Sequence, residues 1–184
     1  MPLSLIHGVG VALVFTLGAV IAQSQTETPL LKIGDQIPAF KLPYATKETV
    51  EMKGIGSADL TGQRYLLAFY PADFSSGCTK EMCTFRDQLA SFEALKVTVL
   101  PVSADLVFAH HEFAKQQNLP FKLLADQTRE FGTKMGVYMP EQGFMKRSVF
   151  VVGPTGKIEF INADYSVKDD TDLNALKGFL AKVK

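Results

Sequence analysis

The stretch Tyr65–Phe85, YLLAFYPADFSSGCTKEMCTF, decides how the rest of the chain must fold. Tyr65–Tyr70 is an apolar run, which is the pattern of a strand buried on both faces of a sheet. Pro71 ends this strand because proline has no N–H to donate to a neighbouring strand. From Ser75 to about Leu95, apolar residues recur every three or four positions, which predicts one helix with a single buried stripe. This helix carries both cysteines of the chain.

The remaining sequence alternates between strand and helix patterns. We expect further strands at Thr49–Met52, Val97–Ser103, Phe121–Ala125, Arg147–Val152 and Lys157–Ile161. We expect further helices at Leu106–Gln117, Thr128–Met135 and Thr171–Val183. Gly34–Pro43 reads as an extended lead-in and Tyr138–Lys146 as a loop. Pro101 requires its strand to lie at an edge or to contain a bulge.

This alternation predicts an α/β fold. The last two strands flank the turn Gly153–Gly156 and form an antiparallel hairpin, so the central sheet is mixed and is flanked by helices. A thioredoxin-like fold is the economical solution for this order of elements. The turn that carries Cys78 then lies at the carboxyl end of a central strand, where open α/β sheets bind their ligands.

The composition limits the classes of function. The chain has 184 residues, of which 47% are hydrophobic and 21% charged, as expected for one globular domain with a short extension. Lys and Arg number 19, as do Asp and Glu, so no basic excess indicates a nucleic-acid partner. Two cysteines are too few for a disulfide scaffold, and they form neither Cys-x-x-Cys nor a zinc-binding pattern.

The amino-terminal segment differs in kind from the rest. Met1–Ala22 contains no charged side chain, and Val9–Ala22 reads as the apolar part of an export signal cleaved before Gln23. The segment is also long enough to span a bilayer as an uncleaved anchor, and a wrong start site or an unexported helix is a third interpretation. The first two interpretations predict an exported protein, periplasmic or extracellular. We therefore divide the chain into residues 1–22 as signal peptide or membrane anchor, 23–33 as linker and 34–184 as the folded domain.

Cys78 lies in the first turn of the predicted helix. Free backbone N–H groups and the positive end of the helix dipole favour an anion there, which enriches the nucleophilic thiolate. Ser75 lies three residues earlier, so its hydroxyl can hydrogen-bond the sulfur or a bound substrate oxygen. Gly77 leaves the approach to the sulfur free of a side chain.

Cys83 follows Cys78 by five residues. In an unbroken helix this spacing corresponds to about 500° of rotation and about 7.5 Å of rise, so the Cα atoms lie about 8–9 Å apart. A disulfide needs a Cα separation of roughly 4.4–6.8 Å. The two cysteines therefore bridge only if the first helical turn unwinds, which suits a redox switch better than a structural disulfide.

The motif Pro71-x-x-x-Ser75-x-x-Cys78 resembles the Pro-x-x-x-(Thr/Ser)-x-x-Cys active-site motif of the peroxiredoxins, the AhpC/TSA superfamily. The block GCTKEMCTFRD, Gly77–Asp87, resembles their Q-type branch, also called bacterioferritin comigratory protein. The similarity extends over the whole predicted domain. Ser75 replaces the commoner Thr, and Ser76 stands where this branch usually has Pro.

The resemblance implies a thiol peroxidase with an antioxidant role. It implies that Cys78 is the peroxidatic nucleophile and Cys83 the resolving cysteine. It further implies that Ser75 and Arg147 polarise the peroxide while Pro71 shields and shapes the pocket. A guanidinium at Arg147 suits this role because it can both stabilise a thiolate and hold peroxide oxygens.

The resemblance also implies a catalytic cycle. The Cys78 thiolate attacks hydrogen peroxide or a small organic hydroperoxide and becomes a sulfenic acid. The helix start unwinds, Cys83 attacks, and a thioredoxin-like dithiol reduces the resulting intramolecular disulfide. This chemistry needs no metal and no organic cofactor. We expect the protein to be a monomer or a weak dimer.

Three other functions are considered. A disulfide oxidoreductase on the same fold would normally contain Cys-x-x-Cys, which is absent. A copper chaperone of the Sco type would contain Cys-x-x-x-Cys and a distant His, whereas here the spacing is one residue longer and the histidines lie elsewhere. A binding module with an inert disulfide would show no thiol that titrates near neutral pH. Metal analysis and thiol titration distinguish these functions.

Four further residues have simple interpretations. His110 and His111 point about 100° apart on a helix, so we expect one surface and one half-buried side chain and not a pair of metal ligands. Glu81 and Arg86 flank the cysteines, and we expect them to pair on the helix surface or to tune Cys78.

Overall fold

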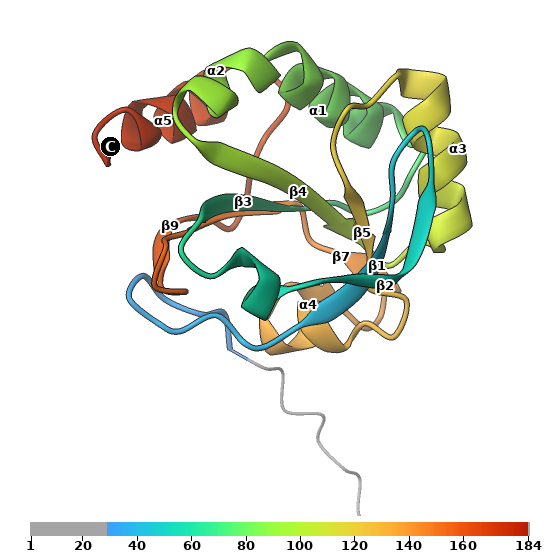
Figure 1. The fold of residues 1–184 in the computed structure, drawn as a ribbon, viewed down its shortest axis with the longest axis horizontal. Helices are drawn as coiled ribbons and strands as arrows, with labels where there is room; N and C mark the ends of the chain where they lie inside the picture. Colours follow the sequence, from blue (N-terminus) through green and yellow to red (C-terminus); the bar gives the residue numbers. More distant parts are fainter. Residues whose placement is uncertain (1–28, 184) are drawn as a thin grey trace, which may run out of the picture.

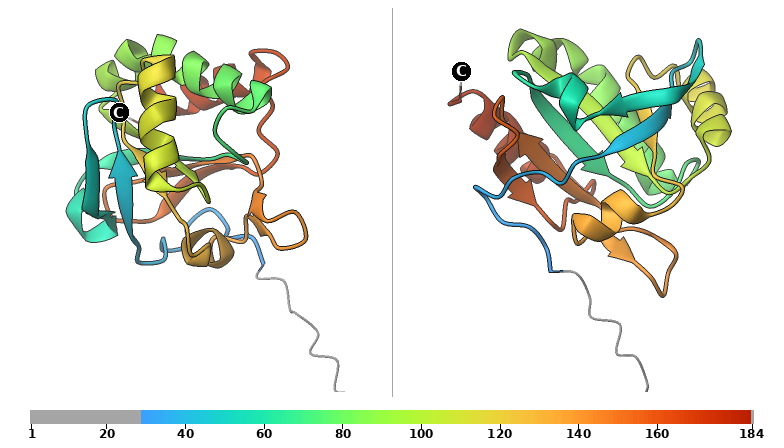
Figure 2. Two further views of the ribbon diagram at one scale, coloured as in Figure 1. Left: turned by 90° about the vertical axis from the view of Figure 1, so that its right-hand side faces the viewer. Right: turned by 60° about the horizontal axis from the view of Figure 1, so that its bottom comes forward.

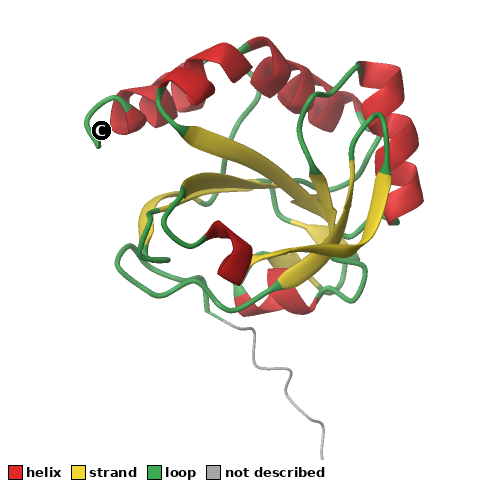
Figure 3. Ribbon diagram, in the orientation of Figure 1, coloured by secondary structure: helices red, strands yellow, loops and turns green. Residues whose placement is uncertain are grey.

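The computed structural model describes residues 29–183 and contains a seven-stranded mixed sheet with helices on both faces (Figures 1 and 3). Its strands are β1 Lys41–Ala45, β2 Val50–Gly56, β3 Arg64–Phe69, β4 Val97–Ser103, β5 Leu123–Ala125, β8 Ser148–Val152 and β9 Ile158–Asn162. The helices are the 3-10 turn η1 Ser57–Leu60, α1 Ser76–Asp87, α2 Leu89–Ala94, α3 Val107–Gln117, α4 Glu130–Lys134 and α5 Thr171–Leu180. The strand order is β2-β1-β5-β4-β3-β8-β9. The predicted thioredoxin-like fold is confirmed.

The sheet is built around β3, which runs parallel to β4 and antiparallel to β8. All five residues from Tyr65 to Phe69 are at most 1% exposed. Leu66 and Ala68 pack into the core under α1, α2 and α5, whereas Leu67 and Phe69 pack into the core that contains α4. Because side chains alternate along a strand, a strand between two helical layers must be apolar throughout. The prediction of a doubly buried strand is confirmed.

The single helix predicted from Ser75 to Leu95 is wrong in one respect, because α1 and α2 are separate helices. Gln88 lies between them, with φ −99° and ψ 2°. Its side-chain oxygen accepts a hydrogen bond from Lys177 of α5 at 2.7 Å. Phe85 and Phe92 remain buried on either side of the break. The apolar period therefore predicts which face is buried, but it does not reveal that a single residue with non-helical dihedral angles divides the helix in two.

Three details of the strand prediction differ from the structure. β4 lies inside the sheet, yet β5 pairs only with Val102 and Ser103, so Pro101 has a pairing partner on β3 alone. The expected lead-in ends in strand β1, which pairs with both β2 and β5. The expected loop before Arg147 contains a small two-stranded ribbon of β6 (Tyr138–Met139) and β7 (Phe144–Met145).

α3 stands beside α1 at the same end of the sheet (Figure 2). Arg86 of α1 donates a hydrogen bond to the backbone oxygen of Gln117, the last residue of α3, at 2.7 Å. Within residues 29–183, no helix has the length and apolar character that a membrane crossing requires. The predicted signal or anchor, residues 1–22, lies outside the described part of the chain.

Candidate active site around Cys78

Cys78 is the third residue of α1 and is fully buried. Ser75 occupies the N-cap position with extended dihedral angles, but its side chain makes no capping hydrogen bond. Its hydroxyl instead donates to the backbone oxygen of Ala72 at 3.1 Å. The first N–H groups of α1 are therefore left without a capping side chain, which suits an anion at the helix start.

Arg147, which is distant from Cys78 in the sequence, contacts it in the fold. Its Nη2 donates to the Cys78 sulfur at 3.3 Å. The reason is the antiparallel pairing of β3 and β8, which sets Phe69 opposite Ser148. The residue before β8 therefore lies close to the turn that follows β3. This register brings together two residues that are 69 positions apart.

Glu81, one helical turn after Cys78, is 1% exposed and forms an ion pair with Nη1 of Arg147. Burial raises the pKa of Glu81 to about 7, and Arg147 opposes this rise. Its other oxygen, Oε1, has no hydrogen-bond partner. Burial would lower the pKa of Arg147, but Glu81 and the Cys78 sulfur together hold it above its ordinary value. The guanidinium is thus a fixed cation shared between a carboxylate and a sulfur.

The site has little spare room. A Cβ atom on Gly77 would lie 3.2 Å from Nη2 of Arg147, closer than most side chains tolerate. The Arg147 side chain is 18% exposed, whereas Cys78 is 0% exposed. A substrate therefore reaches the sulfur only after a small displacement of the neighbouring side chains. The absence of a side chain at Gly77 keeps the guanidinium in place.

Cys83 lies in different surroundings. It is partly exposed, and its thiol donates to the side-chain oxygen of Gln117 on α3 at 3.7 Å. Arg86 lies one turn later, and its pKa is raised first by the hydrogen bond that it donates to Asp87 and then by Cys83. Both cysteines carry free thiols within an intact α1. The geometry therefore agrees with the expectation that they cannot bridge while this helix is formed.

The predicted site residues separate into three groups. Cys78 and Arg147 are in direct contact. Ser75 is exposed and Pro71 is half-buried, and both lie in the loop that enters α1. The expected hydrogen bond from Ser75 to the sulfur is not present, because the hydroxyl bonds to the loop backbone. Cys83 faces α3 and lies apart from the Cys78–Arg147 contact.

Two features were not predicted from the sequence. Glu81 was expected to pair with Arg86 on the helix surface or to tune Cys78, but it is buried and pairs with Arg147, which contacts the Cys78 sulfur. His110 was expected to be at most half-buried, but it is fully buried and pairs with Asp73 in the loop before α1. The available signal was the i+3 spacing of Glu81 from Cys78, which places its side chain on the same helix face.

One cluster has the composition of a metal site. Among residues 29–183, ligand atoms of Asp73, Asp105 and His110 come within 4.8 Å of one another. Both nitrogens of His110 and both oxygens of Asp73 are engaged in hydrogen bonds. The cluster is therefore a satisfied hydrogen-bond network.

The comparison with known proteins agrees with this geometry. The AhpC/TSA family matches residues 33–161. The chain belongs to the AhpC/TSA family. Peroxiredoxin Bcp of Escherichia coli is 33% identical over 156 residues, which cover 80% of this chain and 96% of that protein. Peroxiredoxin Bcp of Bacillus subtilis is 33% identical over 134 residues, which cover 70% of this chain and 82% of that protein.

Solved structures of this family superpose on the chain. Peroxidoxin BcpB from Mycobacterium tuberculosis matches with a TM-score of 0.71 and 27% identity, covering 84% of this chain and 99% of that one. Mycobacterium bovis AhpC matches with a TM-score of 0.72 and 30% identity, covering 84% and 93%. The chain is a peroxiredoxin of the Bcp, or Q-type, branch, and these similarities support a thiol peroxidase over an oxidoreductase of disulfides or a copper chaperone.

Proposed function

We propose that Cys78 is the peroxidatic nucleophile of this peroxiredoxin and that Arg147 activates it. The observation that carries the proposal is the 3.3 Å contact between Arg147 Nη2 and the Cys78 sulfur at the start of α1. A cation and a helix N-terminus both stabilise a thiolate, which is the form that attacks a peroxide. The Arg147 N–H groups can also donate to the peroxide oxygens as negative charge develops on the leaving oxygen.

The reaction proceeds in two oxidative steps. The Cys78 thiolate attacks the terminal oxygen of hydrogen peroxide or a small organic hydroperoxide, the O–O bond breaks, and water or an alcohol leaves after protonation. Cys78 is then a sulfenic acid. The first turns of α1 unwind, the Cys83 sulfur attacks the Cys78 sulfur, and a second water leaves as the disulfide forms. A thioredoxin-like dithiol restores both thiols by exchange. In this proposal Ser75 and Arg147 polarise the peroxide, and Pro71 shields and shapes the place where it binds.

Three forms of the full chain test this proposal, assayed with hydrogen peroxide and a dithiol reductant. Wild type should consume peroxide catalytically and form an intramolecular disulfide, which mass spectrometry assigns without ambiguity because the chain has only two cysteines. Cys78→Ser should be inactive, and turnover in this variant would rule the mechanism out. Cys83→Ser should consume one equivalent of peroxide and then stop unless an external thiol is added.

We infer that residues 1–22 direct the domain of residues 34–184 out of the cytosol, either as a cleaved signal or as a retained anchor. The support is the sequence itself, in which Met1–Ala22 is apolar and free of charged residues. Fractionation of cells that express the full chain tests this localisation. Sequencing the amino terminus of the isolated protein distinguishes a cleaved signal, which starts at Gln23, from an anchor. Recovery of the intact chain in the cytosol would contradict both.

We further propose that the protein is a monomer or a weak dimer. Large exposed apolar side chains in residues 29–183 are few, and they are Leu30, Ile33, Met52, Phe74, Leu106 and Phe108. Obligate dimers bury larger and more apolar surfaces than six exposed side chains provide. Sedimentation velocity over a range of concentrations tests the proposal, and a concentration-independent oligomer would contradict it.

A further inference from the structure

A cavity of about 310 Å³ lies at the opposite end of β3 from Cys78. Three segments enclose it, namely the lead-in at residues 36–39, η1 with the residue that follows it, and the turn between β8 and β9 at residues 154–156. Tyr65, the second residue of β3, also lines it. One water occupies about 30 Å³, so the cavity has room for a small organic molecule. It is a separate place from the site around Cys78.

The walls of this cavity are joined to one another by backbone hydrogen bonds. The N–H of Ile37 donates to the oxygen of Gly156 at 2.9 Å, which joins the lead-in to the turn before β9. The N–H of Gly62 donates to the oxygen of Pro154 at 3.0 Å, which joins that turn to the segment after η1. The first N–H of η1 donates to the oxygen of Phe40 at 3.1 Å, which joins η1 to the lead-in. The cavity is therefore formed before any ligand binds, as is usual for ligand sites.

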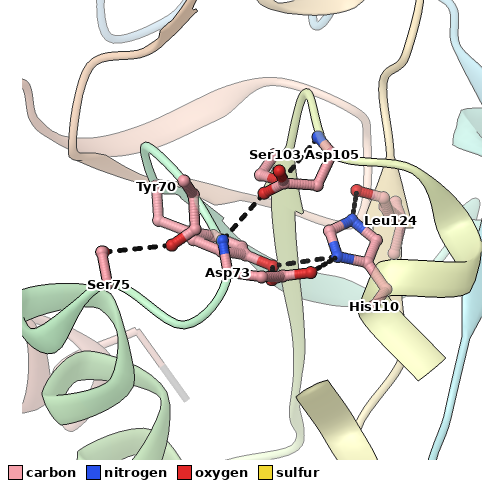
Figure 4. A network of polar contacts seen from close by, with 8 residues as sticks. Tyr70, Asp73, Ser75, Ser103, Asp105, His110 and Leu124 are labelled. Carbon is pink, nitrogen blue, oxygen red and sulfur yellow. Dashed lines mark hydrogen bonds and ion pairs between the residues drawn. The ribbon is translucent and has the colours of Figure 1, made fainter. Parts of the chain in front are cut away.

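The hydroxyl of Tyr65 distinguishes this cavity from an ordinary surface depression. Tyr65 near the start of β3 and Tyr70 just after its end are both at most 1% exposed. The Tyr70 hydroxyl forms a hydrogen bond with Asp73 at 2.7 Å (Figure 4), whereas the Tyr65 hydroxyl has no partner among residues 29–183. Most buried polar groups have such a partner. Burial raises the pKa of Tyr65 to about 12, so at neutral pH the hydroxyl keeps its proton and can donate it.

The chemistry of the lining favours an uncharged ligand. Of the described residues, those that line the cavity all carry uncharged side chains. An ion placed there would lose its hydration without gaining a counter-charge. Ile37 and Leu60 are buried apolar side chains that an apolar body can contact. The Ser57 hydroxyl accepts a hydrogen bond from the N–H of Phe40 at 3.4 Å, which leaves its own proton available, so Ser57 and Tyr65 both offer donors to a ligand oxygen.

Gln36 forms a movable part of the rim. Its side chain is exposed, and Nε2 donates to the backbone oxygen of Thr155 at 3.3 Å, which is long for a hydrogen bond of this kind. Because Tyr65 is only 1% exposed, a ligand reaches its hydroxyl after a side chain of the rim moves aside. Gln36 can do so by giving up this one contact, while the backbone hydrogen bonds of the walls stay in place.

We propose that this cavity binds a small uncharged molecule with an apolar body and a carbonyl oxygen, and that the Tyr65 hydroxyl donates to that oxygen. The carbonyl supplies the acceptor that this hydroxyl lacks, and the apolar body covers Ile37 and Leu60. The proposal does not rest on the proposed function, because the lining of the cavity includes neither Cys78 nor Arg147.

Acetophenone, toluene and benzoate test this inference, because all three carry a phenyl ring and they differ in the carbonyl oxygen and in charge. Each is titrated into the full chain while NMR spectra record the backbone amides. Acetophenone should shift the amides of Ile37, Ser57 and Gly156 in a saturable way and leave those around Cys78 unchanged. Toluene should bind about fivefold more weakly, since it lacks the acceptor, and benzoate should give no saturable shift. No saturable shift with acetophenone, or equal affinity for any two of the probes, would overturn the inference.

Tyr65→Phe removes the hydroxyl and keeps the ring. Its affinity for acetophenone should fall about fivefold, and its affinity for toluene should stay at the wild-type value. Tyr44→Phe is the matched control, because Tyr44 lies on β1 and does not line the cavity, and it should keep both affinities. An unchanged affinity for acetophenone in Tyr65→Phe, or an equal loss for toluene, would overturn the inference. If Tyr65→Phe does not fold, the titration of wild type with the three probes decides it.

Discussion

The two cysteines of α1 lie in opposite surroundings, although only five residues separate them. Cys78 is fully buried, and its sulfur accepts a hydrogen bond from the charged Arg147, which is also paired with buried Glu81. Cys83 is partly exposed, and its long contact is with the neutral side chain of Gln117. One thiol is enclosed against a buried cation, whereas the other is partly exposed, with a long contact to Gln117 and with Arg86 nearby.

This difference matches the two tasks that the proposed cycle assigns to the thiols. Cys78 must attack from a fixed position, so a rigid and charged site favours its reaction. Cys83 must leave its position when the helix unwinds, so strong contacts to its thiol would slow disulfide formation. The comparison teaches that reactivity here depends on what surrounds each sulfur, since the helix itself is shared by both. The following predictions test the two surroundings separately.

The largest effect is expected for Arg147→Met. Removing a charged donor to the reacting centre typically lowers a rate by about 10²–10³-fold. We therefore expect a loss of this size in the rate constant for Cys78 oxidation, measured by rapid quench and mass spectrometry. Arg64→Met is the control, because Arg64 pairs with Glu159 at 2.8 Å and is also 18% exposed, but lies at the other end of β3. Equal rates in the two variants would contradict the role of Arg147.

Glu81→Gln should change the pH dependence of stability. Burial raises the pKa of Glu81 from 4.5 to about 7, so between these values the native state holds a proton that the unfolded state has released. The free energy of unfolding therefore falls as the pH rises through this window, by at most about 3 kcal/mol from this group. Glutamine cannot titrate, so the variant should lack this decline. Urea unfolding of both proteins at several pH values measures the difference, and a constant difference would contradict the prediction.

Gly77→Ala should disturb the same surroundings more mildly. The added Cβ atom would lie 3.2 Å from Nη2 of Arg147, which is held by Cys78 and Glu81 and has little freedom to move away. We expect a decrease of about tenfold in the rate of Cys78 oxidation, since small misplacements of a catalytic group have effects of this order. Gly178→Ala, on α5, is the control because no atom lies within 4 Å of its added Cβ. An unchanged rate in Gly77→Ala would show that the guanidinium can adjust.

The smallest effect is expected for Arg86→Gln, which acts on the surroundings of Cys83. Arg86 joins α1 to the end of α3 through Gln117, and it lies close enough to Cys83 for the sulfur to raise its pKa. We expect disulfide formation to slow about threefold, because a neighbouring cation favours the attacking thiolate. Cys78 oxidation should keep its wild-type rate. If Arg86→Gln slowed Cys78 oxidation and left disulfide formation unchanged, Arg86 would act on Cys78 and not on Cys83, and the prediction would be wrong.

The fold was largely predictable from local patterns. The apolar run in Tyr65–Tyr70, the helical period after it and the turn at Gly153–Gly156 each identify one element, and their order restricts the topology. The break at Gln88 was not predictable, because the apolar period continues across it from Phe85 to Phe92. Patterns of apolar residues record which face is buried, but they do not record contacts between distant side chains.

The sequence by itself predicted the nucleophile of the proposed function, its position at a helix start and the spacing that separates Cys78 from Cys83 in a formed helix. It did not determine their surroundings. Arg147 was identified through a family motif, since an arginine at the start of a strand is otherwise read as a surface charge. Only the antiparallel register of β3 and β8 brings it to the sulfur.

The surroundings of Glu81 and His110 also depend on the tertiary structure. Both are residue types that are usually exposed, and both are buried here because a partner from another element balances the charge or supplies the hydrogen bond. Pairings of this kind depend on residues that are 66 and 37 positions apart. The chain's local chemistry therefore specifies what Cys78 can do, and the tertiary structure specifies which charges stand around it.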